Sequence, residues 1–249
     1  MFPDKALEAV VRKEVYEKRY NEEPLTKEDV KDISQIDGNG KGIKSLAGLE
    51  FCVAVQEIKL EGNEIEDVTP LSGLKLLQSV NLAGNKIKSI DALADLTRMQ
   101  YLKLSENEIE DISALEKMTN MRSLYLSGNK IRKVKVLKNL PKVWTLYLDR
   151  NPVKNFRPIG KLPWLSSLKL EGCGVEDVSF LAPLTELKSL YLRDNKISDL
   201  SPLVKMAQSD DKQRFAPFWR IYLKGNPLGD AALEQMEELK KIGARIKID

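Results

Sequence analysis

Leucine and asparagine recur along this chain at a fixed spacing of 22 residues. We mark the asparagine position of each repeat. A leucine lies three residues before each marked position, and an isoleucine or valine follows two residues after most of them. A fixed period of this length is typical of a repeat protein, in which each repeat forms one turn of a coil. The last interval is 31 residues, so one repeat must hold a nine-residue insertion. The marked positions hold Asn63, Asn85, Asn107, Asn129, Asn151, Cys173, Asn195 and Asn226.

Each position of the repeat predicts a local structure. The alternation of leucine, polar residue and leucine predicts a short strand that pairs in parallel with the strand of the next repeat. The asparagine amide that follows can bond backbone groups, which cost about 1 to 3 kcal/mol each when buried unpaired. Segments beginning at Asp67, Asp111 and Asp199 predict short 3₁₀-like turns on the convex side. The predicted fold is an α/β solenoid, a right-handed superhelix with a parallel concave β-sheet and short convex turns or loops.

The two ends of the chain have different patterns, which predict caps for the ends of the coil. Asp4 can start a helix that places Leu7 and Val11 on one face, and residues 26–29 have the pattern of a capping box. Asp230 can start a helix that Gly243 stops, before a last strand at 245–248. We expect one continuous domain, with a helical cap at 1–40, repeats at 41–228 with an insertion near 208–217, and a helix-strand cap at 229–249.

The repeats resemble those of the bacterial internalins and of the related phosphatase-regulatory leucine-rich subunit. The segment from Phe2-Pro3-Asp4 through Leu25-Thr26-Lys27-Glu28-Asp29-Val30 is similar to the helical cap of internalins, which the phosphatase subunit lacks. The resemblance implies a secreted or cell-surface bacterial protein that acts in adhesion or recognition. The alternative is an intracellular, cytoplasmic scaffold like the phosphatase-regulatory subunit.

Composition narrows the possible chemistry. The chain has 249 residues, two cysteines and no histidine, which excludes Ser-His-Asp and Cys-His catalysis and histidine zinc sites. Its 40 Lys and Arg against 37 Asp and Glu leave a net charge of +3, too little by itself to indicate nucleic acid. The longest apolar run, residues 51–55, is far shorter than the roughly 20 residues that cross a bilayer. We expect no enzyme, no cofactor and no inserted membrane segment.

Two local motifs have plain structural interpretations. The segment Asp37–Gly42 resembles the start of an EF-hand loop, but Lys41 takes one ligand position and Gly48 takes the position of the bidentate carboxylate. A glycine-rich turn fits it better than a calcium site. Cys52 falls in an apolar convex position and Cys173 replaces a ladder asparagine. Five and a half repeats separate them, so we expect two buried thiols and no disulfide between them.

The concave face differs from the rest of the surface. Side chains that flank the inward leucines point outward there, and they include five of the seven tyrosines. Trp144 and Trp219 share the position just before a strand, so we expect both to border this face. Protein interfaces favour Tyr, Trp and Arg at their centres. The sequence therefore predicts a protein-binding site formed by Tyr101, Tyr125, Trp144, Tyr147, Arg150, Lys169, Tyr191, Arg193, Trp219, Arg220, Tyr222 and Lys224. We expect the protein to be a monomer.

Three alternatives remain for this face. Its tyrosines suit strands and can simply pack on one another along the ladder. Its aromatic and basic residues together also fit a carbohydrate. Nucleic acid fits less well, because Asp149, Glu171 and Asp194 interrupt any positive stripe. Within the insertion, Arg214 and Phe215 are expected on a projecting loop that can carry contacts.

Overall fold

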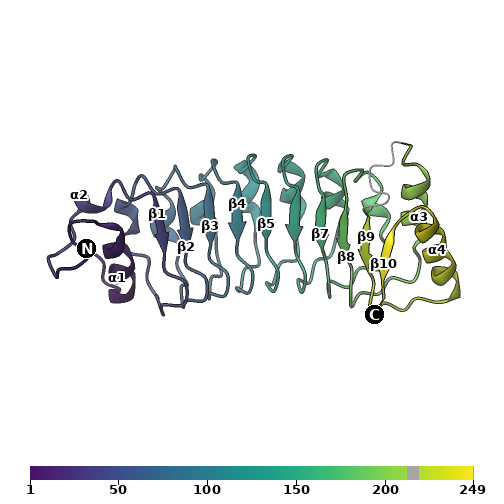
Figure 1. The fold of residues 1–249 in the computed structure, drawn as a ribbon, viewed down its shortest axis with the longest axis horizontal. Coiled ribbons are helices and arrows are strands. Elements are labelled where there is room, and N and C mark those ends of the chain that lie inside the picture. Colours follow the sequence, from purple (N-terminus) through teal and green to yellow (C-terminus); the bar gives the residue numbers. More distant parts are fainter. Residues whose placement is uncertain (212–218, 249) are drawn as a thin grey trace. The chain divides into compact units, whose positions relative to one another are not determined.

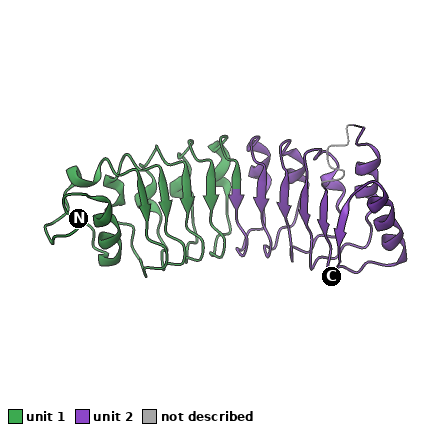
Figure 2. Cartoon of the chain, viewed as in Figure 1, with its two compact units in different colours: residues 1–123 green, residues 124–249 purple. Residues whose placement is uncertain are grey.

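The computed structural model describes residues 1–211 and 219–248 of the chain. Arg214 and Phe215, on which we expected loop contacts, lie outside the described residues. The chain divides into two compact units, residues 1–123 (unit 1) and 124–249 (unit 2), as Figure 2 shows. The division into one domain with two caps stays a prediction.

Unit 1 begins with two helices and continues with strands that alternate with 3₁₀ turns (Figure 1). Its elements are α1 (Lys5–Glu14), α2 (Lys27–Val30), β1 (Gln35–Asp37), η1 (Leu49–Phe51), β2 (Glu57–Lys59), η2 (Thr69–Leu71), β3 (Ser79–Asn81), η3 (Asp91–Leu93), β4 (Tyr101–Lys103) and η4 (Ser113–Lys117). Strand β5 (Ser123–Tyr125) falls at the boundary.

Unit 2 continues the alternation and ends with two longer helices. Its elements are η5 (Lys135–Asn139), β6 (Thr145–Tyr147), η6 (Arg157–Lys161), β7 (Ser167–Lys169), η7 (Ser179–Leu181), β8 (Ser189–Tyr191), α3 (Ser201–Gln208), β9 (Arg220–Tyr222), α4 (Asp230–Lys241) and β10 (Arg245–Lys247). No helix among the described residues has the length and apolar character needed to cross a membrane.

Strand order follows chain order, and the pairing is parallel in both units. Ile58 lies opposite Val80, and Val80 opposite Leu102, so the 22-residue spacing translates directly into register. The predicted parallel sheet and its 3₁₀ turns are confirmed. We call one repeat of the coil a rung, the solvent-facing side of the strands the strand face, and the side of the 3₁₀ turns the turn side.

One convex segment differs from the prediction. The sequence beginning at Asp199 was expected to form a 3₁₀-like turn, but Ser201–Gln208 forms the α-helix α3. A 22-residue repeat leaves little room for such a helix, whereas this repeat has nine additional residues. The longer rung therefore accommodates a full two-turn helix on the turn side.

The asparagine ladder joins the rungs from inside. The amide oxygen of Asn85 accepts a hydrogen bond from the Ile65 backbone N–H at 3.0 Å, and its amide nitrogen donates to the carbonyl oxygens of Leu60 and Leu82 at 3.0 and 2.9 Å. Asn195 makes the equivalent bonds in unit 2. Each amide thus satisfies backbone groups of two rungs, as predicted.

The helices and the last strand that the sequence predicts at the two ends of the chain are also present. The Asp4 carboxylate accepts from the backbone N–H groups of Ala6 and Leu7 at the start of α1, and its second oxygen accepts from the backbone of Lys44 and Ser45 in the first rung. Residues 26–29 form the capping box of α2. At the other end, α4 begins at Asp230, and β10 pairs in parallel with β9.

The glycine-rich segment at 37–42 is a turn, as expected. Gly40 and Gly42 both have positive φ angles, of 62° and 71°, which favour glycine. The Asn39 side chain accepts a hydrogen bond from the Glu61 backbone N–H at 2.7 Å, and the Gly40 N–H donates to the Glu61 carbonyl oxygen at 2.8 Å. These bonds attach the turn to the next rung.

Both cysteines are buried and free, which confirms the predicted burial. Burial raises the pKa of Cys52 to about 12 and that of Cys173 to about 11. Because the thiolate is the reactive form, we expect neither thiol of the folded protein to react with 5,5′-dithiobis(2-nitrobenzoate) at pH 8, whereas both should react in denaturant. Rapid labelling of one thiol in the folded protein would contradict this assignment.

Candidate binding surface

The strand face of unit 2 carries a row of tyrosines at the third position of its strands. Tyr125 and Tyr147 meet edge to face, with ring centroids 5.1 Å apart, and Tyr147 meets Tyr191 at 6.4 Å. Tyr191 stacks on Tyr222 at 4.5 Å with only 8° between the ring planes. The rungs thus bring four predicted site residues into one continuous aromatic row. All four side chains are partly exposed.

Cations border the C-terminal end of this row. The Arg193 guanidinium lies 5.1 Å from the Tyr222 ring centroid, and the Lys247 ammonium lies 5.9 Å from it. Burial, followed by the neighbouring Tyr222 and Tyr147, raises the pKa of Tyr191 above its ordinary value. The Tyr191 hydroxyl therefore stays protonated at neutral pH and can donate a hydrogen bond to a ligand.

An ion-pair network lies beside the row. Asp149 has only 2% of its surface exposed, accepts a hydrogen bond from the Ser127 hydroxyl at 2.8 Å and lies 3.3 Å from the Lys169 ammonium. Lys169 also pairs with Glu171 at 3.1 Å, and Arg193 lies 3.8 Å from Glu171. Burial opposes the charge on Lys169, but its two acidic neighbours outweigh this and raise its pKa. Lys169 and Arg193 are thereby fixed in position next to the tyrosines.

Other predicted site residues lie around this row. Arg220 is exposed at the start of β9, Lys224 is exposed just after β9, and 53% of the Trp144 surface is exposed just before β6. Arg150 is exposed with a positive φ of 55°, a backbone conformation that costs a non-glycine residue about 1 to 2 kcal/mol. Tyr101, also a predicted site residue, belongs to β4 of unit 1.

The expectation that Trp219 borders an exposed face is wrong. Only 1% of its surface is exposed, so its side chain belongs to the core. Trp219 shares a repeat position with Trp144, but it follows α3 and the nine additional residues of the longer rung. The two positions therefore have different surroundings. Trp164, which the sequence analysis did not single out, has 63% of its surface exposed. Its repeat position holds Lys142 one rung earlier, so no aromatic column marks it.

The first rungs of the strand face of unit 1 are polar, and their charges are largely neutralised by contacts with one another. The Glu61 carboxylate accepts from the Asn81 amide at 2.7 Å and from the Lys103 ammonium at 2.9 and 3.1 Å. These hydrogen bonds lower the pKa of Glu61. Lys59 pairs with Glu57 at 3.2 Å. This agrees with the absence of aromatic residues from the first rungs and points to unit 2 as the candidate surface.

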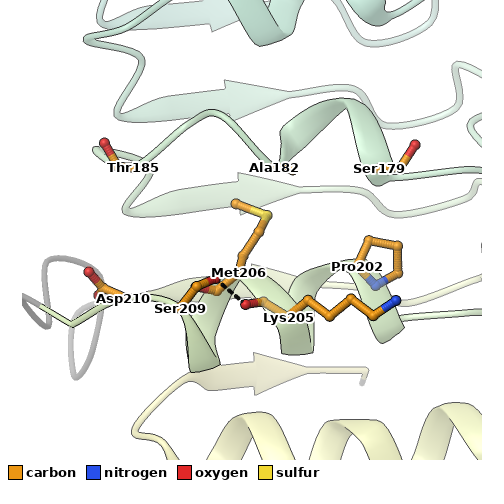
Figure 3. A pocket seen from close by; sticks show the side chains of 8 residues that line it. All are labelled: Ser179, Ala182, Thr185, Pro202, Lys205, Met206, Ser209 and Asp210. Atoms are coloured by element: carbon orange, nitrogen blue, oxygen red, sulfur yellow. Dashed lines mark hydrogen bonds between the residues drawn. The ribbon is translucent and has the colours of Figure 1, made fainter.

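A hollow of about 300 Å³ opens on the turn side of unit 2, between η7 and α3 (Figure 3). Met206 extends from α3 into it, and the Ser209 hydroxyl donates to the Lys205 carbonyl oxygen. None of the predicted site residues lines it; its residues are Ser179, Ala182, Thr185, Pro202, Lys205, Met206, Ser209 and Asp210. Among the described residues, no group of three or more Cys, Asp or Glu side chains is arranged to hold a metal ion.

Comparison with known proteins identifies the class. Residues 53–109 match the family described as "Leucine rich repeat", and residues 97–139 match "Leucine Rich repeats (2 copies)". A comparison with curated protein sequences gives no match. Together with the repeat geometry, these matches show that the chain is a leucine-rich repeat protein.

Solved structures refine this assignment. The chain is similar to internalin C2 of Listeria monocytogenes, with 29% identity, a TM-score of 0.80 and coverage of 90% of this chain and 94% of that one. Its likeness to internalin F of the same bacterium has 24% identity, a TM-score of 0.50 and coverage of 99% and 91%. A leucine-rich repeat protein of Leptospira interrogans shares the fold at 17% identity, with a TM-score of 0.70 and coverage of 89% and 62%. The leucine-rich repeat protein described here is therefore internalin-like, as its N-terminal cap predicted.

Proposed function

We propose that this protein is a binding module, not an enzyme, and that it holds a protein ligand on the strand face of unit 2. The observation that supports this most strongly is the continuous row from Tyr125 to Tyr222, bordered by Arg193 and Lys169. Large amphipathic side chains held in fixed positions lose little conformational entropy when they bind, which is why interfaces use them. Leucine-rich repeat proteins are typically binding scaffolds.

The proposed location is extracytoplasmic, secreted or on a bacterial surface. The likeness to internalin C2 at 29% identity supports it, together with the helical cap of α1 and α2. An intracellular scaffold would use the same strand face on an enzyme, so location and binding surface are separate parts of the proposal. Carbohydrate binding by this face is less favoured, because Trp219, one of its two expected tryptophans, is buried.

The test is the double variant Tyr147→Ala/Tyr191→Ala used as bait in a pull-down beside the wild type. We expect the specific protein ligand to be lost from the variant, since truncation of central interface tyrosines costs about 2 kcal/mol or more each. The matched control is Glu57→Ala/Lys59→Ala, which alters the strand face of unit 1 and should keep the ligand. Circular dichroism checks that each variant is folded.

If the tyrosines only stabilise the ladder, the double variant will lose unfolding free energy and still retain every ligand that the wild type captures. That outcome would contradict the proposed site. Loss of the same ligand from both double variants would equally contradict it, because it would place the contact outside the tyrosine row.

A further inference from the structure

Basic charge is concentrated in two consecutive rungs. Residues 124–170 contain eleven Lys and Arg and one acidic residue, Asp149, which gives this segment a formal charge of +10. Because the whole chain carries +3, the remainder carries −7. The small net charge of the chain therefore conceals a strongly basic region within unit 2. The single acid does not offset it on the surface, since Asp149 is buried on the strand face.

These cations lie mainly on the turn side, on and around η5 and η6. The two turns pack against each other, and the Lys154 backbone N–H donates to the Arg132 carbonyl oxygen at 3.2 Å. Among the described residues, seven of these side chains are exposed and make no ion pair within 4.0 Å. We call them the basic band: Arg132, Lys133, Lys135, Lys138, Lys154, Arg157 and Lys161.

One residue of the basic band replaces a group that stabilises other rungs. Asp67, Asp111, Asp177 and Asp199 each accept a hydrogen bond from the backbone N–H two residues later, at 2.7 to 2.9 Å, at the start of the turn segment. Lys133 occupies the same repeat position ahead of η5. A lysine has no acceptor, so η5 begins without this cap. The rung thus has a positive charge where four other rungs have a stabilising aspartate.

Two exposed tryptophans lie at the edge where these turns return to the strands. Trp164 follows η6, and the Trp144 carbonyl oxygen accepts hydrogen bonds from the backbone N–H groups of Ser166 and Ser167 at 2.9 Å. The two tryptophans therefore lie on the same edge of neighbouring rungs, with 53% and 63% of their surfaces exposed. An exposed indole face can pack against the C–H groups of a sugar ring.

We propose that the basic band binds a linear anionic polysaccharide, with sulfate or uronic acid groups on the cations and sugar rings on Trp144 and Trp164. The band follows the course of the chain around two rungs, from the turn after the ladder asparagine, through η5 and η6, to the edge before the strands. A flexible polymer can follow such a path. A flat lipid surface can contact only part of it.

A nucleic acid also provides regular negative charge, but it fits the aromatic residues less well. Proteins that bind single strands place aromatic side chains at successive bases along the groove. Here the two exposed tryptophans both lie at the edge where the turns return to the strands, and not along the whole basic band. The polysaccharide site occupies the turn side, so it is separate from the protein ligand proposed for the strand face. The two proposals can fail independently.

Heparin is the probe, with binding measured by isothermal titration calorimetry at several salt concentrations. The variant Lys135→Gln/Lys138→Gln/Arg157→Gln should lose about tenfold or more in affinity and show a shallower salt dependence, because fewer counterions are released. The control Lys13→Gln/Lys41→Gln/Lys88→Gln removes the same charge from exposed sites in unit 1. It should stay within about twofold of the wild type. Equal losses in both variants would overturn the proposal.

Lys133→Asp separates binding from folding. It restores the acceptor of the other rungs, so the melting temperature should rise while heparin affinity falls. Unchanged heparin affinity in this variant would contradict the proposal. Trp164→Ala should weaken heparin binding at constant charge, and an unchanged affinity would overturn the assigned role of the indoles. Tighter binding of a single-stranded oligonucleotide of equal charge, or of phosphatidylglycerol vesicles, would overturn the choice of a polysaccharide.

Discussion

Replacement of Asn85 by alanine is expected to lower the free energy of unfolding by about 3 kcal/mol. The substitution removes the acceptor of the Ile65 N–H and the donor to the Leu60 and Leu82 carbonyl oxygens. All three partners belong to buried residues, and Asn85 itself is only 8% exposed, so water cannot replace the lost bonds at low cost. Urea denaturation followed by circular dichroism measures the effect.

Two comparisons isolate the amide as the cause. Asn21→Ala changes an exposed asparagine and should stay within about 0.5 kcal/mol of the wild type. Asn85→Cys should fall between wild type and Asn85→Ala, because the Cys173 thiol at the equivalent position still donates to the Leu148 carbonyl oxygen at 3.3 Å. If Asn85→Ala were no more destabilised than Asn21→Ala, the ladder would have no role in holding the rungs together.

The repeating part of the fold was predictable because each position has the same surroundings in every rung. A leucine such as Leu82 or Leu104 is buried in each case, and the parallel register follows from the common 22-residue spacing. The ring contacts from Tyr125 to Tyr222 result from the same register. A period in the sequence thus fixes which side chains are neighbours, although the sequence does not state what they bind.

Departures from the period were not predictable in this way. The burial of Trp219 and the helix α3 both occur in the rung that has nine additional residues, where equivalent positions no longer have equivalent neighbours. The exposed Trp164 lies in a column that is otherwise not aromatic. The net charge of the whole chain, +3, did not predict the basic band, because it averages these cations with acidic residues elsewhere. The net charge of each separate repeat is the sequence signal that predicts the basic band.

Replacement of Gly160 by alanine is expected to destabilise the protein by about 3 kcal/mol. Gly160 lies in η6, and a Cβ atom there would overlap the carbonyl oxygen of Phe180 in the next rung. Backbone cannot move aside as a flexible side chain can, so the η6 and η7 turns would have to separate. Phe156 and Phe180, whose rings stack at 5.5 Å beside this contact, would then lose part of their packing. Thermal and urea unfolding measure the loss.

Gly73→Ala is the matched control, because a Cβ on Gly73 would meet no atom within 4 Å and its φ angle is not in the left-handed region. Alanine there restricts the unfolded chain without straining the folded one, so we expect no loss and a gain of up to about 1 kcal/mol. A loss of unfolding free energy in Gly160→Ala and a gain in Gly73→Ala would show that the two glycines differ in their surroundings. The close spacing of neighbouring turns, and not glycine content as such, would then limit which side chains the turn side can hold. Equal effects would mean that η6 and η7 are not in close backbone contact in solution.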